Sequence, residues 1–332
     1  MEQPRGDAAA GSQETAPSDC VCNDDEVSQA TLWASRTPWY YAAVLWLVQL
    51  GSVPSHVAIM PDGSRRFAQR TGTDLRRTYI VGALLFGRAC RWCFEAGVSR
   101  VTVFVFALRH MRRSTYEKTA LFSAAMDTWA NSLRTLSHID SLGMRMMCVG
   151  QTELLPIEQQ IKLAELEVAT SHSQRSHTCL ICTGYSSKNQ MARAALHLAK
   201  AVKAAIITTK DVTAELLDAY IAHTECPDVD MLMLCAGPRF SDFMVMQCSY
   251  AYLHITPKMW PEVDFWEWIC AFLMYQLHWC DISTAKEKHR ALEAIRRGLP
   301  DPERALRQQI FIKSVTAAGT EAFGHSGAHL KN

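Results

Sequence analysis

Net charge is nearly absent from this 332-residue sequence, in which 34 Lys and Arg residues face 33 Asp and Glu residues. A formal charge of +1 gives no global field that would attract nucleic acid, so we expect no nucleic-acid partner. Twelve cysteines are too few for a disulfide scaffold in a chain of this length, and several lie in apolar runs. They predict buried, reduced thiols and a cytoplasmic protein.

Two cysteine pairs have the CxxC spacing of metal sites, Cys90 with Cys93 and Cys179 with Cys182. A structural zinc site takes four ligands, and here one pair lies in a helical pattern while the other lies in a strand-like run. We therefore favour core packing for all four thiols and predict no metal cluster from them.

Long hydrophobic runs are missing as well. The most apolar stretch, between Pro38 and Val53, is interrupted by Gln49 and Gly51 and is shorter than the ~20 residues of a membrane-spanning helix. Its Trp and Tyr residues suit a helix that lies in the membrane interface, which allows peripheral membrane contact. A helix packed on the protein's own surface is the alternative.

The chain divides into four predicted parts. Residues 1–30 lack both an apolar period and the features of a secretory signal, which predicts a disordered leader. Residues 31–54 contain the amphipathic or interfacial N-terminal helix, 55–290 form one domain, and 291–332 form a C-terminal helix with a loose tail from about residue 317.

Short apolar runs alternate with long helical patterns through the central part. The predicted strands are 56–60, 100–106, 144–149, 178–182 and 230–235, and the helices between them include 79–97, 115–135 and one whose apolar stripe contains Ile157, Ile161 and Val168. Several runs are apolar throughout, which is typical of strands covered on both faces. The pattern predicts an α/β fold with a mostly parallel central sheet and helices on both faces.

Charged residues follow the first predicted strand, where ligands bind in such folds. Asp62, Gly63, Ser64, Arg65 and Arg66 stand between the strand and the next helix. Glycine permits close backbone approach, the helix N-terminus favours an anion, and guanidinium groups match phosphate oxygens. A carboxylate among such groups favours Mg²⁺ bridging a diphosphate, although a simple turn would give the same local pattern.

Two further segments bring cations towards the same edge of the sheet. Arg109, His110, Arg112 and Arg113 follow the second predicted strand, and Arg239 follows the fifth. A solvated basic loop is the alternative for Arg109 and Arg112. Arginines from three separate segments, in a chain with almost no net charge, favour a diphosphate site.

The segment from His56 to Arg70, HVAIMPDGSRRFAQR, resembles the signature of the cis-prenyltransferases, the family of undecaprenyl and dehydrodolichyl diphosphate synthases. The resemblance continues in order through RWCFEAGVSRVTVFVF, MRMMCVGQTELLP, TCLICTGYSSKNQM and FSDFMVMQCSYAYLHITPKMWPEVDFWEW, and covers about residues 38–285. The apolar stretch before it is similar to the N-terminal helix of the eukaryotic dehydrodolichyl branch.

The resemblance implies a condensation of farnesyl diphosphate with isopentenyl diphosphate into a long polyprenyl diphosphate that grows into an apolar tunnel. It also implies Mg²⁺ as cofactor, a homo- or heterodimer with a family homologue, and a place at the endoplasmic reticulum, as in dolichol synthesis. The implied catalytic residues are Asp62, which carries the metal, and His110 as a proton acceptor. The implied substrate-binding residues are Gly63, Ser64, Arg65, Arg66, Phe67, Arg76, Arg113, Arg239 and Ser241. Candidate tunnel walls, for which core packing is the alternative, are Leu84, Leu85, Phe86, Leu121, Phe122 and Met126.

Several positions depart from the family pattern, and they fall on its chemistry. The replacements are Ser64 for Asn, Tyr79 for His, Ala107 for Ser, Arg109 for Glu, His110 for Asn, Leu234 for Arg, and Tyr252 for a magnesium-binding Glu. They leave a second hypothesis open, a catalytically impaired subunit or regulator that pairs with an active cis-prenyltransferase. A third hypothesis is a binding module for another isoprenoid or nucleotide phosphate.

Overall fold

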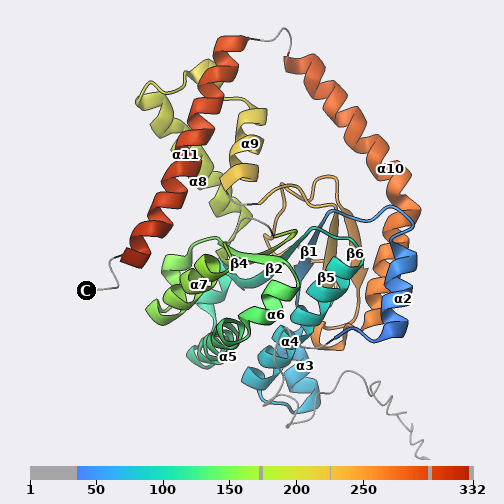
Figure 1. Ribbon diagram of the computed structural model, residues 1–332. Helices are drawn as coiled ribbons and strands as arrows, with labels where there is room; N and C mark the ends of the chain where they lie inside the picture. Colours follow the sequence, from blue (N-terminus) through green and yellow to red (C-terminus); the bar gives the residue numbers. More distant parts are fainter. Residues whose placement is uncertain (1–35, 172–174, 225, 298–300, 329–332) are drawn as a thin grey trace, which may run out of the picture.

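The computed structural model describes residues 36–171, 175–224, 226–297 and 301–328, and its centre is one parallel β-sheet (Figure 1). The strand order is β3-β4-β2-β1-β5-β6, and every neighbouring pair is parallel. The strands are β1 (His56–Met60), β2 (Arg100–Ala107), β3 (Met144–Val149), β4 (His177–Tyr185), β5 (Met231–Cys235) and β6 (Tyr252–Thr256). The predicted α/β fold with a parallel sheet is confirmed.

Both faces of the sheet are buried, which explains the continuously apolar strands. Val57 and Ile59 of β1 belong to the larger core cluster, to which α4 (Leu75–Glu95), α5 (Thr115–Arg134), α7 (Ile157–Ala169) and α10 (Phe265–Arg297) contribute. Ala58 and Met60 point to the opposite face, where they belong to a cluster that includes Phe243 and Met244 of the segment between β5 and β6. One face is therefore covered by helices and the other partly by an irregular segment.

The remaining elements are helical. Within the described residues they are α2 (Trp39–Val48), α3 (Ser64–Thr71), α6 (Leu136–Ser141), α8 (Ser187–Lys203), α9 (Ala214–Thr224), α11 (Pro302–Ala328) and four short 3₁₀ helices, of which η1 (Leu108–Arg112) follows β2. The cysteines of both CxxC pairs are buried, in α4 and β4, as expected for core residues.

Two predictions about helices are wrong. The expected apolar stripe of α7 faces outwards, because Ile157 and Val168 are exposed while Gln159, Leu163 and Leu166 are buried. The loose tail expected from residue 317 is instead helical, since α11 continues to Ala328. The predicted leader, 1–30, lies outside the described residues.

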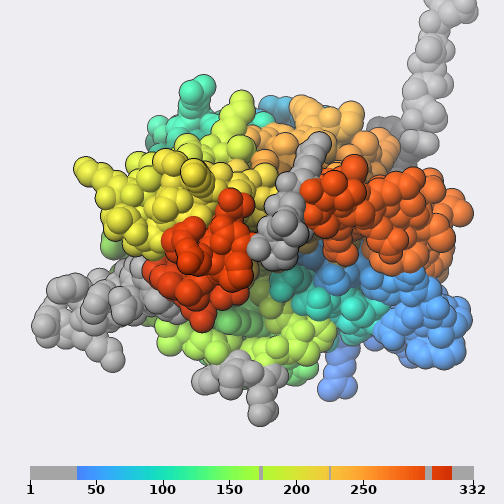
Figure 2. Space-filling model, turned by 90° about the horizontal axis from the view of Figure 1, so that it is seen from above, coloured from blue at the N-terminus to red at the C-terminus, as the bar shows by residue number. Residues whose placement is uncertain are grey.

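The outer helices form two groups (Figures 1 and 2). α2 lies against α10, where Tyr41 stacks on Phe265 with ring centroids 3.7 Å apart and Gln276 donates a hydrogen bond to the Val48 carbonyl. α11 packs with α8 and α9 through Phe311, Leu198 and further members of a separate small core. No helix in the described ranges has the length and apolar character needed to cross a bilayer.

Candidate active site

The candidate site begins at the carboxyl end of β1, where the chain turns into α3. Gly63 has a φ of 100°, and a Cβ atom there would lie 2.7 Å from the Met259 side chain, so only glycine fits this turn. Its backbone N–H donates to Asp62 Oδ1 at 2.7 Å, and the Trp260 N–H donates to the Asp62 carbonyl at 2.9 Å. These contacts fix the Asp62 carboxylate at the start of α3.

A second segment, which follows β5, reaches the same point. Arg239 Nη2 donates to Asp62 Oδ2 at 2.9 Å, and Arg66 Nη2 donates to the Ala236 carbonyl at 3.1 Å. The carboxyl ends of neighbouring strands β1 and β5 therefore bring a carboxylate and two guanidinium groups together.

The third segment is η1, which follows β2. Arg113 Nη1 donates to the Tyr79 hydroxyl at 3.3 Å, and Arg113 Nη2 donates to His110 Nε2 at 2.8 Å. Burial lowers the pKa of the Arg113 guanidinium and raises the pKa of the Tyr79 hydroxyl, and Arg113 opposes the latter shift. Tyr79, at the position where the family pattern has His, therefore supports Arg113 as a neutral acceptor.

Both ring nitrogens of His110 face N–H groups, although a neutral imidazole accepts a hydrogen bond at one nitrogen only. The Ala107 N–H lies 3.3 Å from Nδ1, while Arg113 faces Nε2. Burial, followed by repulsion from Arg113 and Arg109, lowers the His110 pKa to about 3. These features oppose the expected role of proton acceptor, because such a base is weak at neutral pH and accepting a proton would displace Arg113.

Arg65 and Glu117 connect α3 to the start of α5. Their side chains form an ion pair at 2.8 Å, and this contact lowers the Glu117 pKa and raises the Arg65 pKa. Ser114 and Glu117 form a capping box that begins α5 next to the site.

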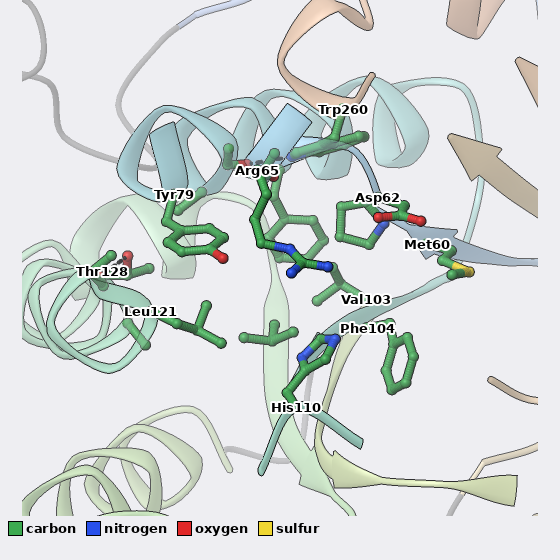
Figure 3. Close-up of a pocket in the computed structure, with 18 of the residues that line it drawn as sticks. Met60, Asp62, Arg65, Tyr79, Val103, Phe104, His110, Leu121, Thr128 and Trp260 are labelled. Atoms are coloured by element: carbon green, nitrogen blue, oxygen red, sulfur yellow. Dashed lines mark hydrogen bonds between the residues drawn. The ribbon is translucent and has the colours of Figure 1, made fainter. Parts of the chain in front are cut away.

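The three segments line a polar cavity that shares lining residues with an adjoining apolar cavity, and Figure 3 shows the apolar one. The polar cavity is lined by Asp62, Gly63, Arg65, Arg66, Gln69, Arg109, His110, Arg112, Arg113, Glu117 and Arg239. Six arginines against two carboxylates give this lining a formal charge of +4 with His110 neutral. Asp62 and Glu117 therefore leave four positive charges of the lining unneutralised, and these suit a polyanion.

The apolar cavity lies between α4, α5 and β2. It shares Asp62, Gly63, Arg65, Arg109, His110 and Arg113 with the polar cavity and is otherwise lined mainly by apolar side chains, among them Phe86, Val103, Leu121, Trp129 and Trp260. Figure 3 shows Leu121 and Thr128 of α5 across the cavity from Met60 and Asp62. A charged opening next to an apolar interior suits an amphipathic molecule with an anionic end.

Most of the predicted site residues meet here. Asp62, Gly63, Ser64, Arg65, Arg66, His110, Arg113 and Arg239 line one or both cavities, as do Phe86 and Leu121 of the predicted tunnel walls. Phe67, Arg76 and Ser241 line neither cavity, and Arg76 instead pairs with Asp127 of α5. Leu84, Leu85, Phe122 and Met126 also lie outside the lining, and the first three belong to the core or pack against it, so core packing describes those three better.

Sequence reasoning missed Gln69, Glu117 and Trp260 among the lining residues. Glu117 had a readable signal, because Ser114-x-x-Glu117 is the pattern of a capping box after a basic loop. Trp260 had no such signal, since its place depends on a long-range hydrogen bond from Nε1 to the Gly82 carbonyl at 2.8 Å.

The residues present are compatible with a magnesium site that the ligand completes. No cluster of three or more His, Cys, Asp or Glu side chains suited to a metal occurs in the described part of the chain. Mg²⁺, however, is often held by one or two carboxylates together with phosphate oxygens, and Asp62 supplies one carboxylate within the arginine-lined cavity. Tyr252, at the position of the family's second carboxylate, is the first residue of β6. It therefore lies at the amino end of the parallel strands, whereas Asp62 lies at their carboxyl end.

Comparisons with known proteins agree with this geometry. A family model, Prenyltransf, described as an undecaprenyl diphosphate synthase, matches residues 59–279. The dehydrodolichyl diphosphate synthase complex subunits of Mus musculus and Homo sapiens are 27% and 25% identical over 284 residues, which is 85% of this chain and 85% of each relative. An isoprenyl transferase of Chlamydia caviae is 29% identical over 69% of this chain and 92% of its own length.

Solved structures show the same fold. Lavandulyl diphosphate synthase from Lavandula x intermedia, in complex with dimethylallyl diphosphate, superposes with a TM-score of 0.62 at 22% identity, over 68% of this chain and 95% of that one. A probable undecaprenyl diphosphate synthase from Campylobacter jejuni gives a TM-score of 0.54 at 20% identity, over the same shares of the two chains.

Proposed function

Because the chain belongs to the undecaprenyl diphosphate synthase family of cis-prenyltransferases, we propose that it condenses an allylic diphosphate with isopentenyl diphosphate into a polyprenyl diphosphate, as in dolichol synthesis. The observation that carries the proposal is the joining of two cavities, one lined by six arginines and the other apolar. The charged cavity suits the diphosphate groups, and the apolar one suits the prenyl chain. Farnesyl diphosphate is the primer that the resemblance implies.

In the reaction, the allylic C–O bond breaks and inorganic diphosphate leaves with the bonding electron pair. The double bond of isopentenyl diphosphate attacks the allylic carbon, and the adduct then loses a proton to an oxygen of the released diphosphate, which sets the new cis double bond. We assign Arg65, Arg66, Arg113 and Arg239 to holding and orienting the diphosphates, because fixed guanidinium groups stabilise negative charge as it develops on the leaving group. His110 keeps Arg113 in place as a neutral acceptor.

Asp62 is the residue that would hold Mg²⁺, together with oxygens of the bound diphosphate. The metal would neutralise charge on the leaving group. Before ligand arrives, Arg239 neutralises Asp62 at 2.9 Å, so the same carboxylate is positioned without a metal.

Pairing with a homologous subunit is the second part of the proposal. The mouse and human relatives are named as complex subunits, and seven positions of this chain depart from the family pattern. A chain that turns over only with a partner would fit the hypothesis of an impaired subunit.

Contact with a membrane is the third part. Trp39, Trp46, Leu47 and Leu50 are 82%, 59%, 57% and 70% exposed on or directly after α2, and α2 contains no charged residue. The neighbouring α10 adds exposed Trp266, Leu273 and Leu277 to this apolar surface. Aromatic side chains on a short surface helix suit the interface of a bilayer, where a polyprenyl product would partition. A place at the endoplasmic reticulum follows from the resemblance alone.

The function is tested by incubating the purified chain with farnesyl diphosphate, labelled isopentenyl diphosphate and Mg²⁺, alone and with a homologous subunit. Label that enters butanol and is lost in Asp62→Ala supports catalysis by this chain. Product that forms only with the partner, and is unaffected by Asp62→Ala, assigns catalysis to the partner. Absence of product in both arms contradicts the proposal.

A further inference from the structure

The segment between β5 and β6 has an unusual backbone for its sequence. Four residues that are not glycine have positive φ angles: Ala236 at 60°, Ser241 at 53°, Asp242 at 65° and Met244 at 44°. Residues with a Cβ atom are strained in the left-handed region, although Asp and Asn tolerate it better than others. A strained backbone conformation of this kind persists only where contacts with the surrounding structure stabilise it.

Asp242 makes the hydrogen bonds that attach this segment to the start of α8. Its carboxylate accepts hydrogen bonds from Ser186 Oγ and, at 3.3 Å, from the Lys188 N–H, while its carbonyl accepts from the Ser187 N–H at 2.9 Å. The Val245 N–H donates in return to Ser187 Oγ at 3.0 Å. The segment is thus tied to the first turn of α8, which is a rigid element outside both cavities.

The other attachments lie on either side of Asp242. Phe243 is fully buried and stacks on Phe104 of β2, with ring centroids 4.5 Å apart. Arg239, three residues before Asp242, reaches the Asp62 carboxylate in the polar cavity. Between Arg239 and Phe243 the backbone forms a turn, in which the Phe243 N–H donates to the Phe240 carbonyl at 2.9 Å, and the contacts of Asp242 attach this turn to α8.

We propose that Asp242 is a positioning residue for the isopentenyl diphosphate site, and that it acts by tying the strained segment to α8 so that Arg239 faces the polar cavity. The inference rests on the proposed function. Asp242 touches neither cavity, and its effect passes through the backbone of 239–242. Because the segment is already ordered in the folded protein, Arg239 loses less conformational entropy when the ligand binds, and the ligand binds more tightly.

The test compares Asp242→Ala with Asp301→Ala. Asp301 accepts a hydrogen bond from the Arg304 N–H at 3.1 Å at the start of α11, so the control removes a similar carboxylate contact with the first turn of a helix outside the cavities. The readouts are KM and kcat for isopentenyl diphosphate, its dissociation constant by calorimetry, and the unfolding midpoint.

We expect Asp242→Ala to raise KM and the dissociation constant at least tenfold while kcat changes less than threefold. Asp301→Ala leaves all three within twofold. Asp242→Asn, which keeps an acceptor and tolerates a positive φ, stays within threefold of the unaltered chain. If the alanine variant fails to fold, Ser186→Ala, which removes the hydroxyl that donates to the Asp242 carboxylate, takes its place and is expected to raise both constants.

An unchanged KM and dissociation constant in Asp242→Ala, or equal effects in Asp301→Ala, would overturn the positioning role. A failed Asn rescue that accompanies a general loss of stability also counts against it. Turnover that is absent in every form, with binding intact and lost in Asp242→Ala, would instead refute the proposed reaction and leave the positioning role standing.

Discussion

At the scale of single residues, Arg113 has the most constrained position among the six arginines of the polar cavity. Arg113 is partly buried, and its two terminal nitrogens donate to Tyr79 and His110. Both acceptors are neutral, so they do not neutralise the charge of the guanidinium. A guanidinium held in this way is preorganised for an anion, because the ligand need not pay to order it.

Replacing Arg113 with Ala should raise the KM for a diphosphate substrate by about 10- to 150-fold, because one charge-assisted contact of roughly 1.5–3 kcal/mol is lost. Arg76→Ala is the matched control. Its side chain pairs with Asp127 and lines neither cavity, so its KM should stay within threefold. Steady-state kinetics on both variants checks this, and an equal effect would show that Arg76 binds substrate as the resemblance implied.

A buried histidine, His56, and a partly buried one, His110, predict a dependence of stability on pH. Burial lowers the pKa of His56 to about 4 and that of His110 to about 3, whereas both would titrate near 6.5 when unfolded. Between these limits the unfolded chain binds more protons, so the free energy of unfolding should fall as the pH decreases from about 6.5 towards 4.

For His56, which donates or accepts at both ring nitrogens, the loss should reach about 3 kcal/mol at most. Urea unfolding at pH 7 and pH 5 measures the effect. Stability that is constant or rises on acidification would contradict the assignment of neutral, buried rings.

At the scale of helices and strands, the sequence was informative where the apolar pattern was continuous. The five predicted strands are present, with ends that shift by at most three residues. The sixth, β6, was not assigned, because its residues mix Tyr, His and Thr with apolar ones and its edge position leaves Ile255 exposed. The prediction of which face of α7 is buried was wrong for a related reason. Gln159 is buried and donates a hydrogen bond to the Phe122 carbonyl, a contact that the apolar periodicity does not reveal.

The site was predictable in part for the same kind of reason. Asp62 and the arginines follow strand ends, and the geometry of a parallel sheet brings strand ends together. The partners of these residues depend on contacts distant in sequence, such as Arg239 with Asp62 and Trp260 with Gly82. The role of His110 could not be read from the sequence either, because its burial and its two donors exist only in the fold.

The surface formed by α2 and α10 leads to a prediction about membranes. The double variant Trp39→Ser/Trp46→Ser should reduce the fraction of protein that floats with phosphatidylcholine vesicles containing phosphatidylserine by at least threefold, since two exposed indoles no longer enter the interface. Ile157→Ser on α7, at 61% exposure, is the control and should float like the unaltered chain.

Equal flotation of all three proteins, or none for the unaltered chain, would contradict membrane contact through α2. A smaller mass in light scattering for the double variant, without any change in flotation, would identify this surface as an interface between copies of the chain.

The contact of α11 with the rest of the molecule depends on one buried carboxylate. Asp211 is fully buried, and it accepts two hydrogen bonds from Arg307 at 2.8 and 2.9 Å, which hold its pKa below the ordinary range. Arg307→Ala should lower the denaturant concentration at the unfolding midpoint, because Asp211 is left buried with weaker compensation.

Chemical denaturation and limited proteolysis of α11 measure this loss. Gln309→Ala, at an exposed position on the same helix, serves as the control and should leave the unfolding midpoint unchanged. A loss of similar size in both variants would mean that the Asp211 contact is not what attaches α11.

At the scale of the whole molecule, the charged cavity and the apolar cavity together indicate one class of ligand. The fold places strand ends from β1, β2 and β5 around a cavity with a formal charge of +4, and the helices α4 and α5 place an apolar cavity next to it. A diphosphate on a hydrocarbon chain satisfies both, whereas a nucleotide phosphate would leave the apolar cavity unused.

The most direct test is calorimetric titration of the full chain with farnesyl thiolodiphosphate, an analogue that resists ionisation, in the presence and absence of Mg²⁺. We expect saturable binding with a dissociation constant on the order of 10 µM, tightened by Mg²⁺ and weakened at least tenfold in Asp62→Ala when the metal is present. No heat of binding at millimolar ligand, with or without the metal, would contradict it.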